Sequence, residues 1–282
     1  MKRMLEIPHL LYTFWSGRDV GPVVKMCWQS MQLHFPGQQL IISTSEDLPP
    51  AWQLSTLSPQ IKADYARIDA LAKTGGVWMD ASCFLFDDSW VATLRELPES
   101  TQVIGFGAPW DANVLENWAL AAPANSPFML QWRDEFELAK QEQPDKYCQR
   151  VRNQLPGSLI PHLPYLASHA AAAVVRHRFP PASVKLLPSA PCGPFAVHSK
   201  QQWIAGRTAL YLVRQPAAKI HSLCGSFCKL RGVERDLVDR ILRIAPFIVH
   251  GHSIFRTPWD PWLAVMIMLI GIMILIRRSW SS

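Results

Sequence analysis

Hydrophobic residues in the first 43 positions follow the spacing of a strand, then that of a helix, then that of a strand again. Residues 7–15 are an apolar run typical of a strand, residues 20–35 repeat apolar positions at helical spacing, and residues 39–43 form a second short apolar run. Strand, helix and strand in this order are the signature of an α/β layer. We therefore predict an α/β fold for this part of the chain.

The same pattern continues to about residue 140 and is weaker beyond it. The further predicted elements are a Pro/Ser-rich loop over 44–59, a helix over 61–74 that ends at Gly75-Gly76, a strand over 77–86 interrupted by one polar triplet, short strands over 101–106 and 118–122, and a helix over 127–140. In the second half they are a helix over 159–175, a proline-rich, loop-like stretch over 180–216 with one or two strands, and a basic amphipathic helix over 234–244.

Charge is divided unevenly along the 282 residues. The net charge of +6 combines −6 over residues 1–141 with +12 over residues 142–282, and no carboxylate lies between Asp145 and Glu234. Such a stretch repels itself unless an anion lies nearby, and phosphate, anionic lipid and nucleic acid are the candidates. The basic half has few aromatic residues and no recognised nucleic-acid-binding module, so we do not expect nucleic acid as a partner.

Composition narrows the class of protein. With 49% hydrophobic and 18% charged residues, the chain is too apolar to be disordered. Its six cysteines show neither a C-x-x-C pair nor zinc-ligand spacing, which predicts free thiols in a reducing compartment. The N-terminal residues lack the apolar core of a signal peptide.

The C-terminal region predicts a membrane anchor. Residues 262–276 are uncharged and end at Arg277-Arg278. A helix of this length is about 22 Å long against a hydrocarbon core of about 30 Å, so spanning and lying in the interface both stay open. A buried core helix is the alternative. We divide the chain into a domain over 1–233, a basic interfacial segment over 234–257 and an anchor over 258–282, with membrane contact through 258–278. For residues 234–244 an ordinary surface helix packed on the core is the alternative.

The candidate functional residues lie in the segment 63–88. Asp64 and Arg67 are three apart on the predicted helix and so point together. After the Gly-Gly turn, Asp80 follows a strand, and open α/β sheets bind ligands at the carboxyl ends of their strands. These three side chains can together hold a sugar diphosphate. The guanidinium binds phosphate, one carboxylate accepts hydrogen bonds from sugar hydroxyls, and Asp80 binds a divalent metal. An ordinary surface pair of Arg67 with Asp64 is the alternative.

The pattern A-D-x-x-R-x-x-x-L-x-x-x-G-G-x-W-x-D-A-S over 63–82 resembles the sugar-binding region of DXD-type glycosyltransferases. The resemblance is closest to the capsular polysaccharide synthesis family, in which D-A-T/S replaces D-x-D. The opening IPHLLYTFWSG and the segment ENWALAAPANSPFMLQW resemble two further motifs of that family, and residues 192–195 show a weaker resemblance to it. The resemblance covers residues 7–140 well and 141–230 loosely.

The resemblance implies a GT-A-like fold and transfer of a hexosyl group from a nucleotide-sugar donor, with retention of configuration and with Mn²⁺ or Mg²⁺. It implies that Asp80 and Arg67 are the catalytic residues and that Gly75 and Gly76 belong to the substrate-binding motif. The other implied roles are stacking of Trp15 on the nucleobase, binding of donor-sugar hydroxyls by Asp64, binding of donor sugar or diphosphate by Arg67, binding of ribose or metal by Asp80, a metal contact by Ser82, and lining of the donor pocket by Asn117. Core packing for Trp15 and a turn for Asn117 are the structural alternatives.

One position departs from the family pattern. The last Asp of D-x-D is Ser82 here, and a neutral hydroxyl is a weaker metal ligand. Either metal dependence is reduced, or Asp87 or Asp88 compensates, although adjacent acids more often form a solvated turn. The sequence thus predicts a membrane-associated glycosyltransferase with a cytosolic catalytic domain and a glycan or lipid-linked acceptor, in surface polysaccharide or glycoconjugate synthesis. A catalytically inactive binding or scaffold protein is the alternative.

Overall fold

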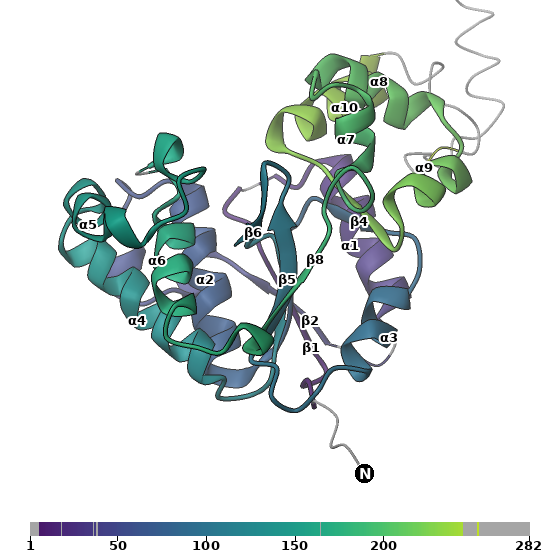
Figure 1. Ribbon diagram of the computed structural model, residues 1–282. Coiled ribbons are helices and arrows are strands. Elements are labelled where there is room, and N and C mark those ends of the chain that lie inside the picture. The colour runs from purple at the N-terminus through teal and green to yellow at the C-terminus, as the bar shows by residue number, and fades with distance from the viewer. Residues whose placement is uncertain are drawn as a thin grey trace, which may run out of the picture.

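A mixed β-sheet with helices on both faces forms the centre of the computed structural model, which describes residues 6–17, 19–35, 37, 39–163, 165–244 and 253 (Figure 1). Within these residues seven strands form one sheet in the order β2-β1-β3-β7-β5-β6, with β8 also paired to β5, while β4 and β9 form a separate two-stranded sheet. The strands are β1 (Leu10–Phe14), β2 (Gln39–Ser43), β3 (Gly76–Met79), β4 (Cys83–Leu85), β5 (Val103–Ala108), β6 (Asp111–Leu115), β7 (Ala119–Ala122), β8 (Val184–Leu187) and β9 (Phe227–Lys229). β1, β2 and β3 are parallel, and β7 runs antiparallel to both β3 and β5.

The helices gather in three groups around the sheet. In Figure 1, α2, α4, α5 and α6 lie on one side of it, α1 and α3 lie on the other, and α7 to α10 gather at one end. The helices are α1 (Pro22–His34), α2 (Pro59–Thr74), α3 (Ser89–Arg95), α4 (Pro127–Gln141), α5 (Pro144–Val151), α6 (Ala167–Arg176), α7 (Ala196–Lys200), α8 (Ala205–Arg214), α9 (Ala217–Cys224) and α10 (Gly232–Ile244).

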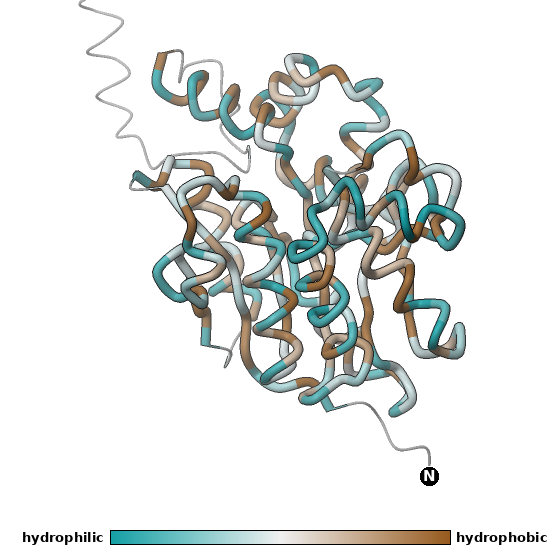
Figure 2. The backbone as a smooth tube through the Cα atoms, turned by 90° about the vertical axis from the view of Figure 1, so that its left-hand side faces the viewer, coloured by the Kyte–Doolittle hydropathy of each residue, from teal (hydrophilic) through white to brown (hydrophobic). Residues whose placement is uncertain are grey.

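Successive side chains of the central strands point to opposite faces, as the two-residue period of a strand requires. In β3, Trp78 packs into the core shared with α2, α4 and α6, whereas Val77 and Met79 pack into the core shared with α1 and α3. Both faces of the sheet are therefore covered. The helices alternate between hydrophilic and hydrophobic stretches along their length (Figure 2), as expected of elements with one buried face.

The turn between α2 and β3 needs two glycines. Gly75 and Gly76 have φ values of 64° and 107°, which L-residues with side chains rarely adopt. A Cβ atom on Gly75 would lie 2.4 Å from the backbone nitrogen of Ala124, and one on Gly76 would lie 2.7 Å from the carbonyl oxygen of Leu10. The glycines thus let α2 end directly against the sheet, which fixes how the side chains of α2 approach β3.

The elements predicted for the first 140 residues are confirmed, with one correction. The run 77–86 is not one interrupted strand, because it divides into β3 and β4, which belong to different sheets. The polar triplet Asp80-Ala81-Ser82 is the turn between them, and the amide of Cys83 donates to the carbonyl of Asp80 at 3.0 Å. The chain therefore leaves the central sheet at the triplet.

The second half contains more regular structure than its sequence predicted. The helix expected over 159–175 is confined to α6, which begins only at Ala167. In the stretch 180–216, expected to be loop-like with one or two strands, β8 confirms a strand, whereas the helices α7 and α8 were not predicted. β8 is stabilised by parallel pairing with β5, a distant contact that no local pattern reveals.

The helix expected over 234–244 is confirmed as α10, but the domain boundary drawn after residue 233 falls inside it. Its apolar residues Val238 and Leu242 are buried in a core shared with α7, α8 and α9. This is the packing of an ordinary helix of the fold, and that face is not free to lie on a bilayer. The remainder of the predicted interfacial segment, apart from Ser253, and the whole predicted anchor over 258–282 lie outside the described residues. Among the helices of the described residues, none is both long and apolar enough to cross a bilayer.

Candidate functional site

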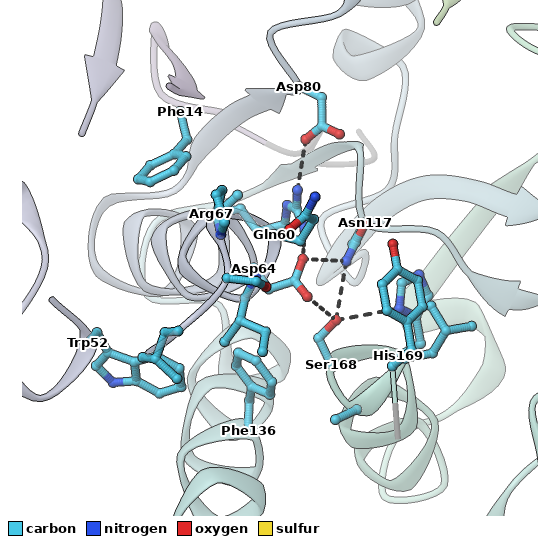
Figure 3. A pocket seen from close by; sticks show the side chains of 18 of the residues that line it. Phe14, Trp52, Gln60, Asp64, Arg67, Asp80, Asn117, Phe136, Ser168 and His169 are labelled. Atoms are coloured by element: carbon cyan, nitrogen blue, oxygen red, sulfur yellow. Dashed lines mark hydrogen bonds and ion pairs between the residues drawn. The ribbon is translucent and has the colours of Figure 1, made fainter. Parts of the chain in front are cut away.

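The pairing of β3 with β7 brings Asp80 and Asn117 to one edge of the sheet. Met79 in β3 lies opposite Ala119 in β7, and the amide of Asp80 donates to the carbonyl of Trp118 at 2.8 Å. Asp80 therefore follows the carboxyl end of β3, as predicted, and Asn117 lies two residues before the start of β7 at the same end of the strand pair. The helix α2 adds Asp64 and Arg67, which point toward this edge (Figure 3).

Arg67 joins the two acids. Its Nη1 forms an ion pair with Asp64, and its Nη2 lies 2.7 Å from Oδ1 of Asp80. The Arg67 side chain is 4% exposed, and its Cζ lies over the ring of Trp78, 5.3 Å from the ring centroid. Burial would lower the pKa of Arg67, but Asp80 and Asp64 outweigh burial and raise it. Each terminal nitrogen thus contacts one carboxylate, so Arg67 holds Asp64 and Asp80 in a fixed relative position.

Lys229, from β9, is the second cation at Asp80. Its Nζ lies 2.8 Å from Oδ2 of Asp80 and 2.9 Å from Oγ of Ser82. Burial would raise the pKa of Asp80, but Lys229 and then Arg67 outweigh it and lower that pKa to about 2. In the same way, burial would lower the pKa of Lys229, and the ion pair with Asp80 raises it above its ordinary value. All three groups are therefore charged at neutral pH.

A polar network surrounds Asp64 on the other side. Nδ2 of Asn117 donates to Oδ1 of Asp64 at 3.0 Å, and Oγ of Ser168 donates to its Oδ2 at 3.0 Å. Ser168 also accepts from Asn117 at 3.2 Å and lies 3.4 Å from Nδ1 of His169, whose Nε2 is 3.3 Å from Glu116. Both carboxylate oxygens of Asp64 are thus held in place by neighbouring side chains.

The cluster lies in the wall of a cavity of about 670 Å³. The cavity also has an aromatic wall formed by Trp52 and Phe136, whose ring centroids lie 5.4 Å apart. Trp52 is supported by stacking on Tyr65, with ring centroids 4.1 Å apart. In Figure 3 the rings of Trp52 and Phe136 lie on the side away from Asp80. An apolar cavity with a few convergent polar groups is the usual form of a small-molecule site.

The structure brings most of the predicted site residues together at this cavity. The predicted residues that line it are Trp15, Asp64, Arg67, Asp80, Ser82 and Asn117. Gly75 and Gly76 are the exception, because they are not among the residues that line this cavity. They lie at the opposite end of β3 from Asp80, outside the described cavity lining, and their close approach to backbone atoms gives them a structural role.

Trp15 lies at the cavity edge rather than in the core. Its ring meets Trp28 edge-on at 6.5 Å between centroids, and the guanidinium carbon of Arg235 lies over it at 5.2 Å. Arg235 comes from α10 and also lines the cavity. The C-terminal helices thus add a cation to the part of the cavity built by the N-terminal half.

The residues at the D-A-S turn do not fit a divalent metal ion. Both donor groups expected for it, Oδ2 of Asp80 and Oγ of Ser82, already bind the ammonium of Lys229, and Oδ1 of Asp80 accepts from Arg67 and from Trp78. The hydroxyl of Ser82 in turn donates to the carbonyl of Leu230 at 2.8 Å. Among the described residues there is no cluster of three His, Cys, Asp or Glu side chains suited to a metal.

The adjacent acids Asp87 and Asp88 do not compensate for Ser82. Asp87 lies 2.7 Å from Nε2 of His221 and also binds Ser89. Neither of these two acids lies among the residues that line the cavity. A carboxylate from this turn therefore does not complete a metal site with Asp80.

Four residues of the site carry no signal in the sequence: Glu116, Ser168, Lys229 and Arg235. His169 is visible as a histidine but its spacing suggests no partner. These residues belong to segments whose position relative to Asp64 and Asp80 depends on tertiary packing. The basic character of the second half is the single feature that could have pointed to Lys229 and Arg235.

Comparison with known proteins agrees with the resemblance seen in the sequence. The family model described as "Capsular polysaccharide synthesis protein" matches residues 2–147. Among curated proteins, none has a significantly similar sequence.

Several solved structures match parts of this chain. The glycosyltransferase PaToxG is 14% identical, with a TM-score of 0.36 over 61% of this chain and 80% of that one. A glycosyltransferase involved in glycosylation of the major capsid of PBCV-1 is 10% identical, with a TM-score of 0.47 over 84% of this chain and 98% of that one. The apo-form of GlyE from Streptococcus pneumoniae TIGR4 is 12% identical, with a TM-score of 0.40 over 71% of this chain and 51% of that one. Similarity at this level does not establish a shared activity.

Proposed function

The chain belongs to the capsular polysaccharide synthesis protein family, and on that premise we propose that it is a glycosyltransferase. In this proposal it moves a sugar from a nucleotide-sugar donor to a glycan or lipid-linked acceptor. The observation that carries the proposal is the cluster of Asp64, Arg67 and Asp80 in the wall of a cavity of about 670 Å³.

The arrangement of charges suits a glycosyl diphosphate. Asp64, with its oxygens held by Asn117 and Ser168, offers fixed acceptors for sugar hydroxyls. Lys229 contacts Asp80 and Arg235 lines the cavity, and in the proposal these two cations supply the positive charge that a diphosphate needs. Preorganised charges in a largely buried site stabilise a developing anion without having to reorganise during the reaction.

The expected nucleobase position is the ring of Trp15. The ring lines the cavity, and Arg235 lies over it, so a base that stacks on Trp15 lies beside a cation. This placement supports the role implied by the family resemblance. The aromatic wall around Trp52 and Phe136 is then left for the acceptor.

In the proposed reaction, the bond between the anomeric carbon and the diphosphate oxygen breaks, and the electron pair stays on the diphosphate. A new bond forms between that carbon and an acceptor hydroxyl oxygen, whose proton is released. Because the charge develops on the departing diphosphate, the cations near Asp80 contribute most to lowering the barrier. The proposal also includes transfer of a hexosyl group with retention of configuration, which the family resemblance supports. It further includes a cytosolic, membrane-associated location, which the apolar residues 262–276 support.

The proposal is tested with a panel of nucleotide sugars and Asp80→Asn. The full chain is expected to release a nucleoside diphosphate from at least one donor, and the variant to release it about 100-fold more slowly, because a neutral amide cannot balance Lys229 and Arg67. Asp134→Asn on the exposed face of α4 is the matched control and should behave as the unmodified protein. Release at the same rate by the folded Asp80 variant would show that the site does not catalyse transfer. Binding of a donor without any turnover would favour an inactive binding protein.

A further inference from the structure

At the turn Asp80-Ala81-Ser82, where a D-x-D site holds its metal ion, the ammonium of Lys229 from β9 lies instead. Nζ of Lys229 lies 2.8 Å from Oδ2 of Asp80 and 2.9 Å from Oγ of Ser82, the first and third residues of D-A-S. The amine thus contacts both positions that the family pattern assigns to the cation. Asp80 and Ser82 both line the cavity, and the Lys229 side chain, which is 10% exposed, contacts both of them from behind that wall.

The position of Lys229 is fixed by the small sheet of β4 and β9. Lys229 lies opposite Cys83, the residue after Ser82, and the amide of Leu230 donates to the carbonyl of Ser82 at 3.0 Å. The amide of Lys229 donates to the carbonyl of Pro194 at 3.0 Å. The backbone on both sides of the ion pair is therefore hydrogen-bonded, and the ammonium is held at the turn as a preorganised charge.

The local charges disfavour a divalent cation beside this amine. Asp80 is already shared between Lys229 and Arg67, whose nearest atoms lie 2.8 and 2.7 Å from its oxygens. A metal ion bound to the same carboxylate would be repelled by both cations at short range, and displacing Lys229 would leave a buried ammonium without its acid partner. The side chain of Lys229 is only 10% exposed, so water would replace that partner poorly.

We propose that Lys229 supplies the positive charge that a divalent metal supplies at a D-x-D turn, so that this protein binds and releases the diphosphate of its donor without a metal ion. This inference rests on the proposed function and names the residue that replaces the metal. The ammonium has three N–H groups, of which Asp80 and Ser82 accept two, and in this proposal the third is donated to a phosphate oxygen of the donor. Serine in place of the last Asp fits this role, because a second carboxylate would compete with the diphosphate for the same cation.

Binding of nucleoside diphosphates by the full chain tests the inference without requiring turnover. UDP, GDP and CDP are titrated by calorimetry, once in EDTA and once in Mn²⁺. At least one is expected to bind with the same dissociation constant, within about twofold, in both conditions. Binding that is abolished by EDTA and restored by Mn²⁺ overturns the inference and leaves the proposed function standing. No binding by any of the three in either condition overturns both.

Variants of Lys229 then identify the cation. In EDTA, Lys229→Met should weaken nucleoside diphosphate binding by about 10- to 100-fold, since a charged hydrogen bond contributes about 1.5–3 kcal/mol, whereas Lys229→Arg should retain part of it. Lys185→Met, at an exposed position of β8, is the matched control. Unchanged binding by a folded Lys229→Met protein contradicts the inference.

A direct metal readout completes the test and also covers poor folding of the single variant. Free Mn²⁺ is followed by electron paramagnetic resonance with the unmodified chain and with the double variant Ser82→Asp, Lys229→Met. The unmodified chain should leave the Mn²⁺ signal unchanged, and the double variant, in which two carboxylates face the vacated position, should reduce it. Stoichiometric Mn²⁺ binding by the unmodified chain, lost in Asp80→Asn, would assign the turn to a metal after all.

Discussion

Ser168, the second residue of α6, donates a hydrogen bond from its Oγ to Oδ2 of Asp64, 104 positions earlier in the chain, at 3.0 Å. Asn117 holds the other oxygen of the same carboxylate. Three segments distant in sequence thus determine the orientation of one acid. The acid proposed to bind sugar hydroxyls is held by Asn117, which the family resemblance indicated, and by Ser168, which no sequence pattern indicated.

The first prediction concerns this serine. Ser168→Ala removes one of the two neutral donors to Asp64, and hydrogen bonds to charged groups contribute about 1.5–3 kcal/mol. Donor turnover, measured as kcat/KM, should fall about 10- to 100-fold, with only a small change in the midpoint of thermal unfolding. Ser222→Ala, on α9 away from the cavity, is the control. Unchanged turnover by the Ser168 variant would show that Asp64 needs no such support.

Arg67 is expected to matter for folding as well as for binding. Arg67→Met leaves Asp64 without its cation and Asp80 with only Lys229, and breaking a buried ion pair on one side costs roughly 3–5 kcal/mol. Arg67→Lys should cost less, although one ammonium cannot reproduce the two-pronged contact of the guanidinium. Urea unfolding measures the loss of unfolding free energy in each of the two variants. Arg133→Met removes a partly exposed arginine of α4 and is expected to cost at most about 1 kcal/mol. A loss for Arg67→Met as small as for this control would contradict the prediction.

The free energy of unfolding at acid pH should depend on the ionisation of Glu234. Burial would raise its pKa, but contacts with His198 and Arg231 outweigh burial and lower it to about 2. Because this pKa is lower in the folded than in the unfolded state, the stabilisation is fully present above the ordinary value of 4.5 and is lost as the pH falls from there toward 2. Glu234→Gln should therefore be destabilised at pH 7, and its difference from the unmodified protein should shrink below pH 4.5, as followed by urea unfolding at each pH. A difference that stays constant down to pH 2 would assign it to causes other than ionisation.

The twin glycines are predicted to act on stability alone. Gly75→Ala combines a positive φ with a Cβ 2.4 Å from a backbone nitrogen, so it should destabilise the protein by about 2 kcal/mol or more. Nucleoside diphosphate affinity of the folded protein should not change, since Gly75 lies outside the described cavity lining. Gly206→Ala, in α8 with open space around it, should be neutral or slightly stabilising. Normal stability with lost affinity would instead support a substrate-binding role for Gly75.

Membrane association is predicted from the sequence of the last 25 residues. The full chain should sediment with vesicles that contain phosphatidylglycerol, whereas a chain ending at residue 257 should stay in the supernatant. Leu269→Asp together with Met273→Asp should weaken association in the full chain, because two charges in the apolar run are costly in the hydrocarbon region. Equal sedimentation of the full and shortened chains would place membrane contact elsewhere.

The local part of the site could be predicted from the sequence. Asp64 and Arg67 share a helix face because three residues make nearly one turn, and Asp80 follows an apolar run that ends a strand. These relationships involve neighbours in the chain, so they survive into the folded protein. The α/β order of the first 140 residues was legible for the same reason, since hydrophobic period is a local property.

The rest was decided by tertiary structure. The run over 77–86 looks like one strand, yet its second half pairs with β9 instead of the central sheet, and this pairing brings Lys229 to Asp80 across 149 positions. The energy of such a contact depends on burial and on the partners that distant segments supply, and neither is encoded in the spacing of nearby residues. The sequence alone therefore determined that two acids and an arginine meet at a strand end. Only the folded chain determined that a lysine completes their charge where a metal was expected.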